Sequence, residues 1–167
     1  MSEQLSTQEL RKLRDLLEVE EIRQLGVLYS QYLDHDYLEQ LVELFAEDAE
    51  CEFGPYGVWK GRKTIYENYV EVERTSGDNP GSKPFQAMHA SVNHWVELTG
   101  PDTAVGRRYL LDLLTNRAAE EHPFIWLAVY DEAYRKIDGA WKIQRSSLQF
   151  LWPQKHVTGE FPGKFPG

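Results

Sequence analysis

The strongest constraint on the fold is the second half of the chain, where β-prone segments follow one another closely. Four such segments occupy residues 86–98, 103–116, 124–137 and 140–151. The sharpest turn signals between them are Gly100-Pro101-Asp102 and Asp138-Gly139. Asp-Gly is a strong hairpin signal, because both residues tolerate the backbone angles of a tight turn. The sequence therefore predicts a meander of long antiparallel strands.

The first half of the chain has helical periodicity. Ser6 and Glu9 have the spacing of a capping box, which predicts a helix that begins near Thr7. An apolar stripe continues from there through Leu10, Leu13, Leu16, Leu17, Ile22, Leu25, Tyr29 and Tyr32. Gly26 lies inside the stripe and indicates either close packing or a break between two helices.

Two shorter helices are expected before the strands. Asp36 and Glu39 repeat the capping-box spacing, and a second helix should end near residues 47–48. Its apolar stripe is Leu38, Leu41, Val42 and Phe45. Residues 49–60 suggest two short strands around Gly54-Pro55. A third helix should follow Gly61, and residues 75–84 should form an exposed loop. The buried side of this third helix should carry Ile65, Tyr66, Tyr69 and Val70.

Helices followed by an antiparallel meander indicate an α+β fold, in which N-terminal helices pack on one face of a curved sheet. The concave face of such a sheet, covered by helices, is a natural pocket. We expect residues 1–151 to form one domain. The tail, residues 152–167, repeats Phe-Pro-Gly and cannot be regular helix or central strand. It should be disordered, or pack over the pocket mouth or a neighbouring subunit.

Charge and composition narrow the classes of partner. The formal net charge is −9 and the basic residues form no cluster, which argues against a nucleic-acid surface and disfavours anionic membranes. The N-terminus lacks the pattern of a signal peptide, and no apolar run could span a membrane, so a cytoplasmic location is expected. The single cysteine, Cys51, excludes an internal disulfide and is expected to be structural. Aromatic residues make up 13% of the chain, which fits an aromatic-lined cavity or a core of large residues.

Asp34 and His89 are the leading candidates for chemistry. Asp34 ends the segment LYSQYLD, where the helical pattern breaks. His89 lies early in the first long strand, on the face shared with Ala87 and Ser91. A histidine on the concave face, oriented by a carboxylate, is a standard general base. The alternative is a hydrogen-bonded structural histidine.

Other polar residues leave alternatives open. Strict alternation puts Asp112 on one face with Arg108, Leu110 and Leu114, either in the pocket or in a surface ion pair. Tyr130 shares a face with Trp126 and could offer a hydroxyl to the pocket or pack in the core.

His35 and His94 are weaker candidates, and no spacing of ligands supports a metal site. No phosphate-binding or nucleotide fingerprint is present either. The residues therefore give no reason to expect a cofactor.

Three segments carry a resemblance to a known family: residues 22–53, MHASVNHWVEL in 88–98, and YRKIDGAWKI in 134–143. Together with the order of elements, they resemble the SnoaL-like branch of the nuclear transport factor 2-like superfamily over roughly residues 15–150. The resemblance implies a cone-shaped α+β barrel around a deep apolar pocket. Within the branch, the chain is most similar to bile-acid dehydratases, scytalone dehydratase and hexachlorocyclohexane dehydrochlorinase. Related dehydratases are trimers, so a homo-oligomer, either trimer or dimer, is implied.

The resemblance also implies an activity, namely elimination without a cofactor through an Asp–His dyad at Asp34 and His89. The bile-acid enzymes also use a tyrosine and a strand aspartate, which match Tyr29 and Asp112. Three family positions differ, because Phe150 replaces an arginine, Leu114 a histidine and Tyr130 an asparagine.

The sequence thus predicts a lyase acting on a hydrophobic cyclic or aromatic small molecule, with loss of water, halide or formaldehyde. His89, Asp34 and Tyr29 are expected to be catalytic. The expected pocket residues are Tyr32, Phe53, Asp112, Trp126, Tyr130 and Phe150. The alternatives are an isomerase or cyclase like ketosteroid isomerase, and a non-catalytic protein that binds a small molecule.

Overall fold

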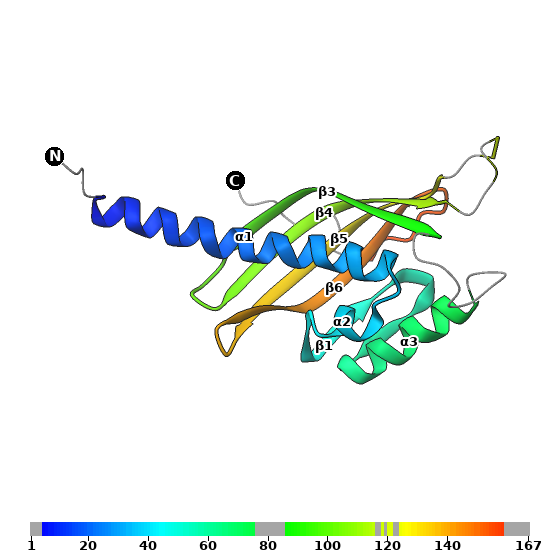
Figure 1. The fold of residues 1–167 in the computed structure, drawn as a ribbon, viewed down its shortest axis with the longest axis horizontal. Coiled ribbons are helices and arrows are strands. Elements are labelled where there is room, and N and C mark those ends of the chain that lie inside the picture. The colour runs from blue at the N-terminus through cyan, green and yellow to red at the C-terminus, as the bar shows by residue number, and fades with distance from the viewer. Residues whose placement is uncertain (1–4, 76–85, 116–117, 119, 122–123, 159–167) are drawn as a thin grey trace.

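A computed structural model describes residues 5–75, 86–115, 118, 120–121 and 124–158. Three helices and a 3-10 turn accompany six strands in these residues, and all three helices precede the four long strands (Figure 1). In chain order the elements are α1 (Thr7–Asp34), α2 (Leu38–Val42), β1 (Phe45–Glu52), η1 (Gly54–Tyr56), β2 (Val58–Lys60), α3 (Arg62–Thr75), β3 (Ala87–Leu98), β4 (Thr103–Leu114), β5 (Phe124–Ile137) and β6 (Ala140–Trp152). The four long strands confirm the expected meander.

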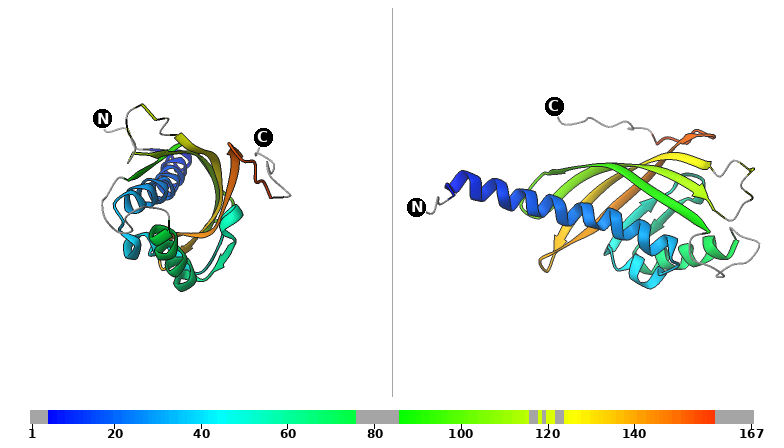
Figure 2. Two further views of the ribbon diagram at one scale, coloured as in Figure 1. Left: turned by 90° about the vertical axis from the view of Figure 1, so that its right-hand side faces the viewer. Right: turned by 45° about the horizontal axis from the view of Figure 1, so that its top comes forward.

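The six strands form one sheet in the order β2-β1-β6-β5-β4-β3. Every neighbouring pair is antiparallel except β1 and β6, which are parallel. The sheet curves around α1 but does not close, so β2 and β3 are its edges (Figure 2). Helices α2 and α3 cover the end of the curved sheet near the C-terminal end of α1. The result is the α+β fold that the sequence predicts.

Helix α1 starts and continues as the sequence indicates. The Ser6 hydroxyl accepts a hydrogen bond from the Glu9 N–H, and the Glu9 carboxylate accepts one from the Ser6 N–H, so the capping box is present. The helix runs unbroken through Gly26, so this glycine marks close packing. A Cβ atom there would lie 3.0 Å from Nδ1 of His94.

The second helix is shorter than expected. It ends at Val42, and Phe45–Glu52 is strand β1, whose Phe45 is fully buried in the core. The expected cap is also wrong: Tyr37 is the N-cap residue, without a side-chain hydrogen bond, and Asp36 is in a left-handed conformation with φ of 61°.

Two expected apolar faces are partly exposed. Ile65 and Tyr69 of α3 are buried, whereas Val70 is 40% exposed. In α1 the leucines before Val19 are also exposed, because the first turns of the helix extend beyond the sheet (Figure 1).

The described part of the tail follows β6. His156 and Phe150 exchange two backbone hydrogen bonds of 2.9 Å each. Both Phe-Pro-Gly repeats, and most of the expected loop at 75–84, lie outside the described residues. None of the described helices has the length and hydrophobicity needed to cross a membrane.

Candidate active site

The C-terminal end of α1 and the start of β3 bring Asp34 and His89 together, although they lie 55 positions apart. Nδ1 of His89 lies 2.6 Å from Oδ1 of Asp34. The backbone N–H of His89 also donates to Oδ1 at 3.0 Å and to Oδ2 at 3.2 Å. Only 3% of the Asp34 side chain and 17% of the His89 side chain are exposed. The carboxylate therefore fixes both the backbone and the ring of the histidine.

This contact has a chemical consequence for the imidazole ring. A carboxylate only accepts hydrogen bonds, so an ionised Asp34 holds the proton of neutral His89 on Nδ1. The lone pair is then on Nε2, the ring nitrogen that can accept a proton. That nitrogen lies 4.0 Å from Oδ1 of Asp112.

Asp112 faces His89 directly across the antiparallel pairing of β3 and β4. Among the described residues, no group donates a hydrogen bond to its buried Oδ1 atom. Burial raises the pKa of this carboxyl group, while attraction to His89 opposes the rise and repulsion by Asp34 adds to it. The environment therefore holds the proton of Asp112 to a higher pH than that of an ordinary aspartic acid. Asp112 is in the pocket, and this resolves the alternative of a surface ion pair.

Three tyrosine hydroxyl groups meet near the dyad. The Tyr29 hydroxyl lies 2.5 Å from that of Tyr69, and the Tyr130 hydroxyl donates to Tyr29 at 3.3 Å. Burial raises the pKa of all three phenols well above its usual value. They therefore remain protonated at neutral pH. We call Tyr29, Tyr69 and Tyr130 the tyrosine cluster.

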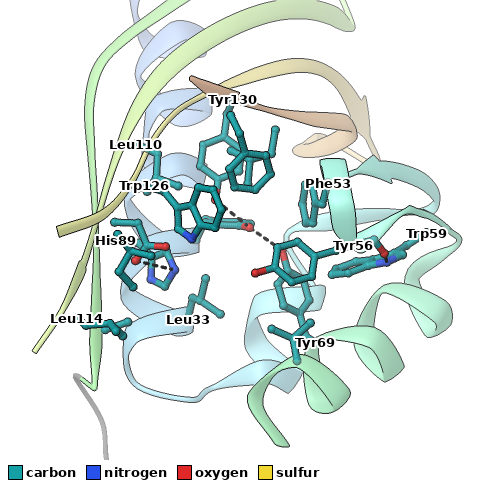
Figure 3. Close-up of a pocket in the computed structure, with 17 residues that line it drawn as sticks. Leu33, Phe53, Tyr56, Trp59, Tyr69, His89, Leu110, Leu114, Trp126 and Tyr130 are labelled. Atoms are coloured by element: carbon teal, nitrogen blue, oxygen red, sulfur yellow. Dashed lines mark hydrogen bonds and ion pairs between the residues drawn. The ribbon is translucent and has the colours of Figure 1, made fainter. Parts of the chain in front are cut away.

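His89 of the dyad, Asp112 and the tyrosine cluster border one cavity of about 340 Å³ (Figure 3). His89, Leu110 and Leu114 lie on one side of it, and Phe53, Tyr56 and Trp59 on the other. The lining residues are Tyr29, Leu33, Phe53, Tyr56, Trp59, Tyr69, Val72, Ala87, His89, Leu110, Asp112, Leu114, Ile125, Trp126, Tyr130, Leu148 and Phe150. Most of these side chains are aromatic or aliphatic, so the cavity suits a small hydrophobic molecule.

One residue that was predicted to line the cavity does not line it. Tyr32 does not line the cavity, and its neighbour Leu33 does, because consecutive helical residues point about 100° apart. Phe53, Trp126, Tyr130 and Phe150 do line it. The sequence indicated that Tyr69 is buried but not that its hydroxyl would meet Tyr29, since that depends on how α3 docks.

The weaker candidates lie elsewhere. His35 is at the C-terminal end of α1, with Nδ1 2.7 Å from the Gln31 carbonyl oxygen. Nε2 of His94 lies 3.0 Å from the Tyr134 hydroxyl, and burial lowers the pKa of His94 to about 4. Cys51 is buried, and its raised pKa keeps the thiol protonated. No three His, Cys, Asp or Glu side chains group as a possible metal site within the described ranges.

Comparisons with known proteins agree with this fold. The model of a family described as SnoaL-like domain matches residues 14–147. No curated protein gave a significant match. A putative scytalone dehydratase from Novosphingobium aromaticivorans DSM 12444 is similar in structure, with 24% identity, a TM-score of 0.70, and coverage of 86% of this chain and 93% of that one.

Two further similar structures both carry the name LinA. LinA shares 20% identity, with a TM-score of 0.71 and coverage of 89% of this chain and 95% of that one. The hexachlorocyclohexane dehydrochlorinase LinA-type3 from Novosphingobium barchaimii LL02 shares 21% identity, with a TM-score of 0.69 and coverage of 89% and 99%. At these identities the likeness concerns the fold.

Proposed function

Because the chain belongs to the SnoaL-like domain family, we propose that it is a cofactor-independent lyase, which eliminates a small leaving group from a hydrophobic cyclic or aromatic molecule. One observation carries the proposal. The His89–Asp34 pair, with a 2.6 Å contact, lies at the wall of a mostly apolar cavity and leaves Nε2 able to take a proton.

The reaction can be written with these side chains alone. Nε2 of His89 removes a proton from a substrate carbon, and the resulting imidazolium is stabilised by the Asp34 carboxylate. The electron pair of the broken C–H bond forms a carbon–carbon double bond. The leaving group departs with its own bonding pair, as hydroxide or halide. Where it is hydroxide, Asp112 supplies the proton that converts it to water.

Charge that develops on an oxygen atom is held by the tyrosine cluster. A preorganised hydroxyl donor in a site that excludes water stabilises such charge strongly. Formaldehyde loss uses the same groups differently. His89 takes the hydroxyl proton of a hydroxymethyl group, the O–H electron pair forms the C=O bond of formaldehyde, and the pair of the broken carbon–carbon bond moves onto a conjugated oxygen of the substrate.

The cavity and the comparisons support the substrate class. A volume of about 340 Å³ fits one cyclic molecule, and the aromatic walls favour a flat or ring-shaped one. Similar structures include proteins described as a putative scytalone dehydratase and a hexachlorocyclohexane dehydrochlorinase. Both names denote elimination reactions on cyclic compounds.

The first test is a screen of hydroxylated and halogenated ring compounds and aromatic dimers for loss of mass. With a compound that reacts, His89→Ala and Asp34→Asn should each lower kcat by about 10²–10⁴, the usual contribution of a general base. His35→Ala is the matched control, because His35 lies at the same helix end but outside the cavity lining.

The screen also separates the alternatives. A product of unchanged mass would indicate an isomerase that uses the same base. If both dyad variants stay folded and keep rates within a few-fold of wild type, the proposed mechanism is wrong. A compound that binds in the cavity and never reacts would favour a binding protein.

A further inference from the structure

Arg108, on β4, is a charged residue that the proposed mechanism does not use. Its side chain is 0% exposed, and its ion-pair partner Glu132, on β5, is 1% exposed. Removing two charges from water has a large free-energy cost, so a fully buried pair needs an explanation beyond stability. Arg108 does not line the main cavity, although it is near the residues that do.

The guanidinium group packs against the tyrosine cluster. Its Cζ atom lies 3.8 Å from the ring centroid of Tyr130 and 4.6 Å from that of Tyr29. Both distances are within the range of a cation–π contact, which is stronger in a site without water. The positive charge is therefore behind the aromatic rings whose hydroxyl groups meet at the cavity.

Hydrogen bonds hold the guanidinium group in this position. Nε and Nη2 donate to the two carboxylate oxygens of Glu132 at 3.1 and 3.2 Å, and Nη1 donates to the Ser91 hydroxyl at 2.5 Å. Glu132 in turn accepts hydrogen bonds from the hydroxyl groups of Tyr134, at 2.6 Å, and Ser146, at 3.1 Å. These hydrogen bonds fix the positions of the Arg108 guanidinium group and the Glu132 carboxylate.

The positive and the negative member of the ion pair contact different groups. Tyr29 and Tyr130 contact Arg108 directly, whereas Tyr134 and Ser146 bind Glu132. The positive end of the pair thus faces the tyrosine cluster. The Arg108 charge lowers the pKa of each phenol in the cluster, against the larger rise caused by burial.

We propose that Arg108 is a positioning residue that polarises the tyrosine cluster, so that the cluster binds an oxygen atom with negative charge. This inference rests on the proposed function and narrows its substrate class to ring compounds that carry a carbonyl or phenolic oxygen. Removal of a proton next to a carbonyl group moves the electron pair onto that oxygen as an enolate, and expulsion of the leaving group returns the pair to carbon. The Arg108–Glu132 ion pair would not stabilise the reaction of a substrate without such an oxygen.

The test uses 4-nitrophenol, whose ionised form absorbs visible light, and 4-nitroanisole, which cannot ionise. The titratable groups that face the cluster are Arg108 on β4, Glu132 on β5 and Cys51 on β1, with Tyr134 and His94 beyond Glu132. Binding is measured by titration near the pKa of the free phenol. All proteins carry His89→Ala, so that the imidazole does not contribute to the ionised fraction.

In this background the protein should increase the ionised fraction of bound 4-nitrophenol. The neutral pair Arg108→Met with Glu132→Gln should weaken binding of the ionised phenol by about tenfold or more. Binding of 4-nitroanisole should change by less than about threefold, because cavity shape is retained. Glu132→Gln alone should raise the ionised fraction and Arg108→Met alone should lower it, whereas Arg108→Lys should give a value between that of Arg108→Met and that of the parent.

A matched control is present on the opposite face of the same strands. Arg107 and Asp131 form an ion pair with an Nε–Oδ1 distance of 2.8 Å, and neither lines the cavity. Arg107→Met with Asp131→Asn should leave both probes unaffected.

The proposal is overturned if the neutral Arg108 and Glu132 variant binds ionised 4-nitrophenol as tightly as its parent, or loses both probes equally. If that variant does not fold, the two single variants decide, since the proposal requires opposite changes in the ionised fraction. Because His89 is absent throughout, the lyase proposal can fail in the turnover tests while this one stands.

Discussion

At the scale of single residues, Asp112 is the group whose protonation should limit the pH range of the reaction. A general acid works only while it holds its proton, and the raised pKa extends that range upward from the usual carboxyl value. Activity should therefore fall as the pH rises through the pKa of Asp112. Asp112→Asn should lower kcat for loss of water by about 10²–10⁴ and remove this alkaline limb of the pH–rate profile.

Asp131→Asn is the control for that variant, because Asp131 is an aspartate on the neighbouring strand whose partner Arg107 is outside the cavity lining. It should keep both the rate and the profile. An unchanged alkaline limb in Asp112→Asn would show that another group is the acid.

The sequence was informative for residues whose direction follows from a simple repeat. Alternation placed His89 on the correct face of β3 and put Asp112 with Leu110, and both lie in the cavity. It could not place the pairing of Arg108 with Glu132, which depends on the register between β4 and β5. The prediction that Tyr32 lines the cavity was wrong. The helix turns by about 100° between Tyr32 and Leu33, and Leu33 is the residue that faces the cavity.

At the scale of elements, Gly26 shows why α1 can lie so close to the sheet. Alanine there would favour the helix by roughly 1 kcal/mol. Its Cβ would, however, lie 3.0 Å from Nδ1 of His94 and 3.2 Å from Cδ of Arg108, and hydrogen bonds hold both side chains in place. We expect Gly26→Ala to lower the free energy of unfolding by about 1 kcal/mol, since overpacking outweighs propensity.

Urea denaturation measures this change. Val27→Ala is the comparison, because Val27 is 52% exposed on the same helix and should change stability by less than about 0.5 kcal/mol. A more stable Gly26→Ala protein would mean that His94 and Arg108 can move aside.

Most helices and strands could be predicted, and the main error has a physical cause. Leu38, Leu41, Val42 and Phe45 have helical spacing, yet the chain becomes strand β1 at Phe45. Strand β1 pairs in parallel with β6, nearly a hundred positions later in register. A tertiary pairing of this kind overrides local periodicity, and no local pattern reports it.

At the scale of the whole molecule, the outer face of the sheet carries several exposed apolar residues. Val92 on β3 pairs in register with Tyr109 on β4, and both are exposed, as is Leu127 on β5. Exposed apolar patches of this kind often mark contacts with other proteins. We expect the protein to form a dimer or trimer through this face.

Light scattering tests this expectation. Val92→Lys should reduce the measured mass to that of one chain, because the lysine charge would have to be buried in the interface. Val70→Lys, at a 40% exposed position on α3 and outside the strands, should leave the mass unchanged. A wild-type protein that is monomeric at all concentrations would contradict the expectation.

Helix α1 carries both Tyr29 and Asp34, and this has a stereochemical consequence. Five helical positions correspond to about 7.5 Å along the axis and about 140° around it. In the proposed mechanism, one rigid element therefore sets where negative charge is held relative to where the dyad removes a proton. We expect a bound ring to present one of its two faces to His89 while its oxygen reaches the tyrosine cluster. The two mirror images of a chiral substrate would then be different molecules to this site, and we expect one of them to react faster.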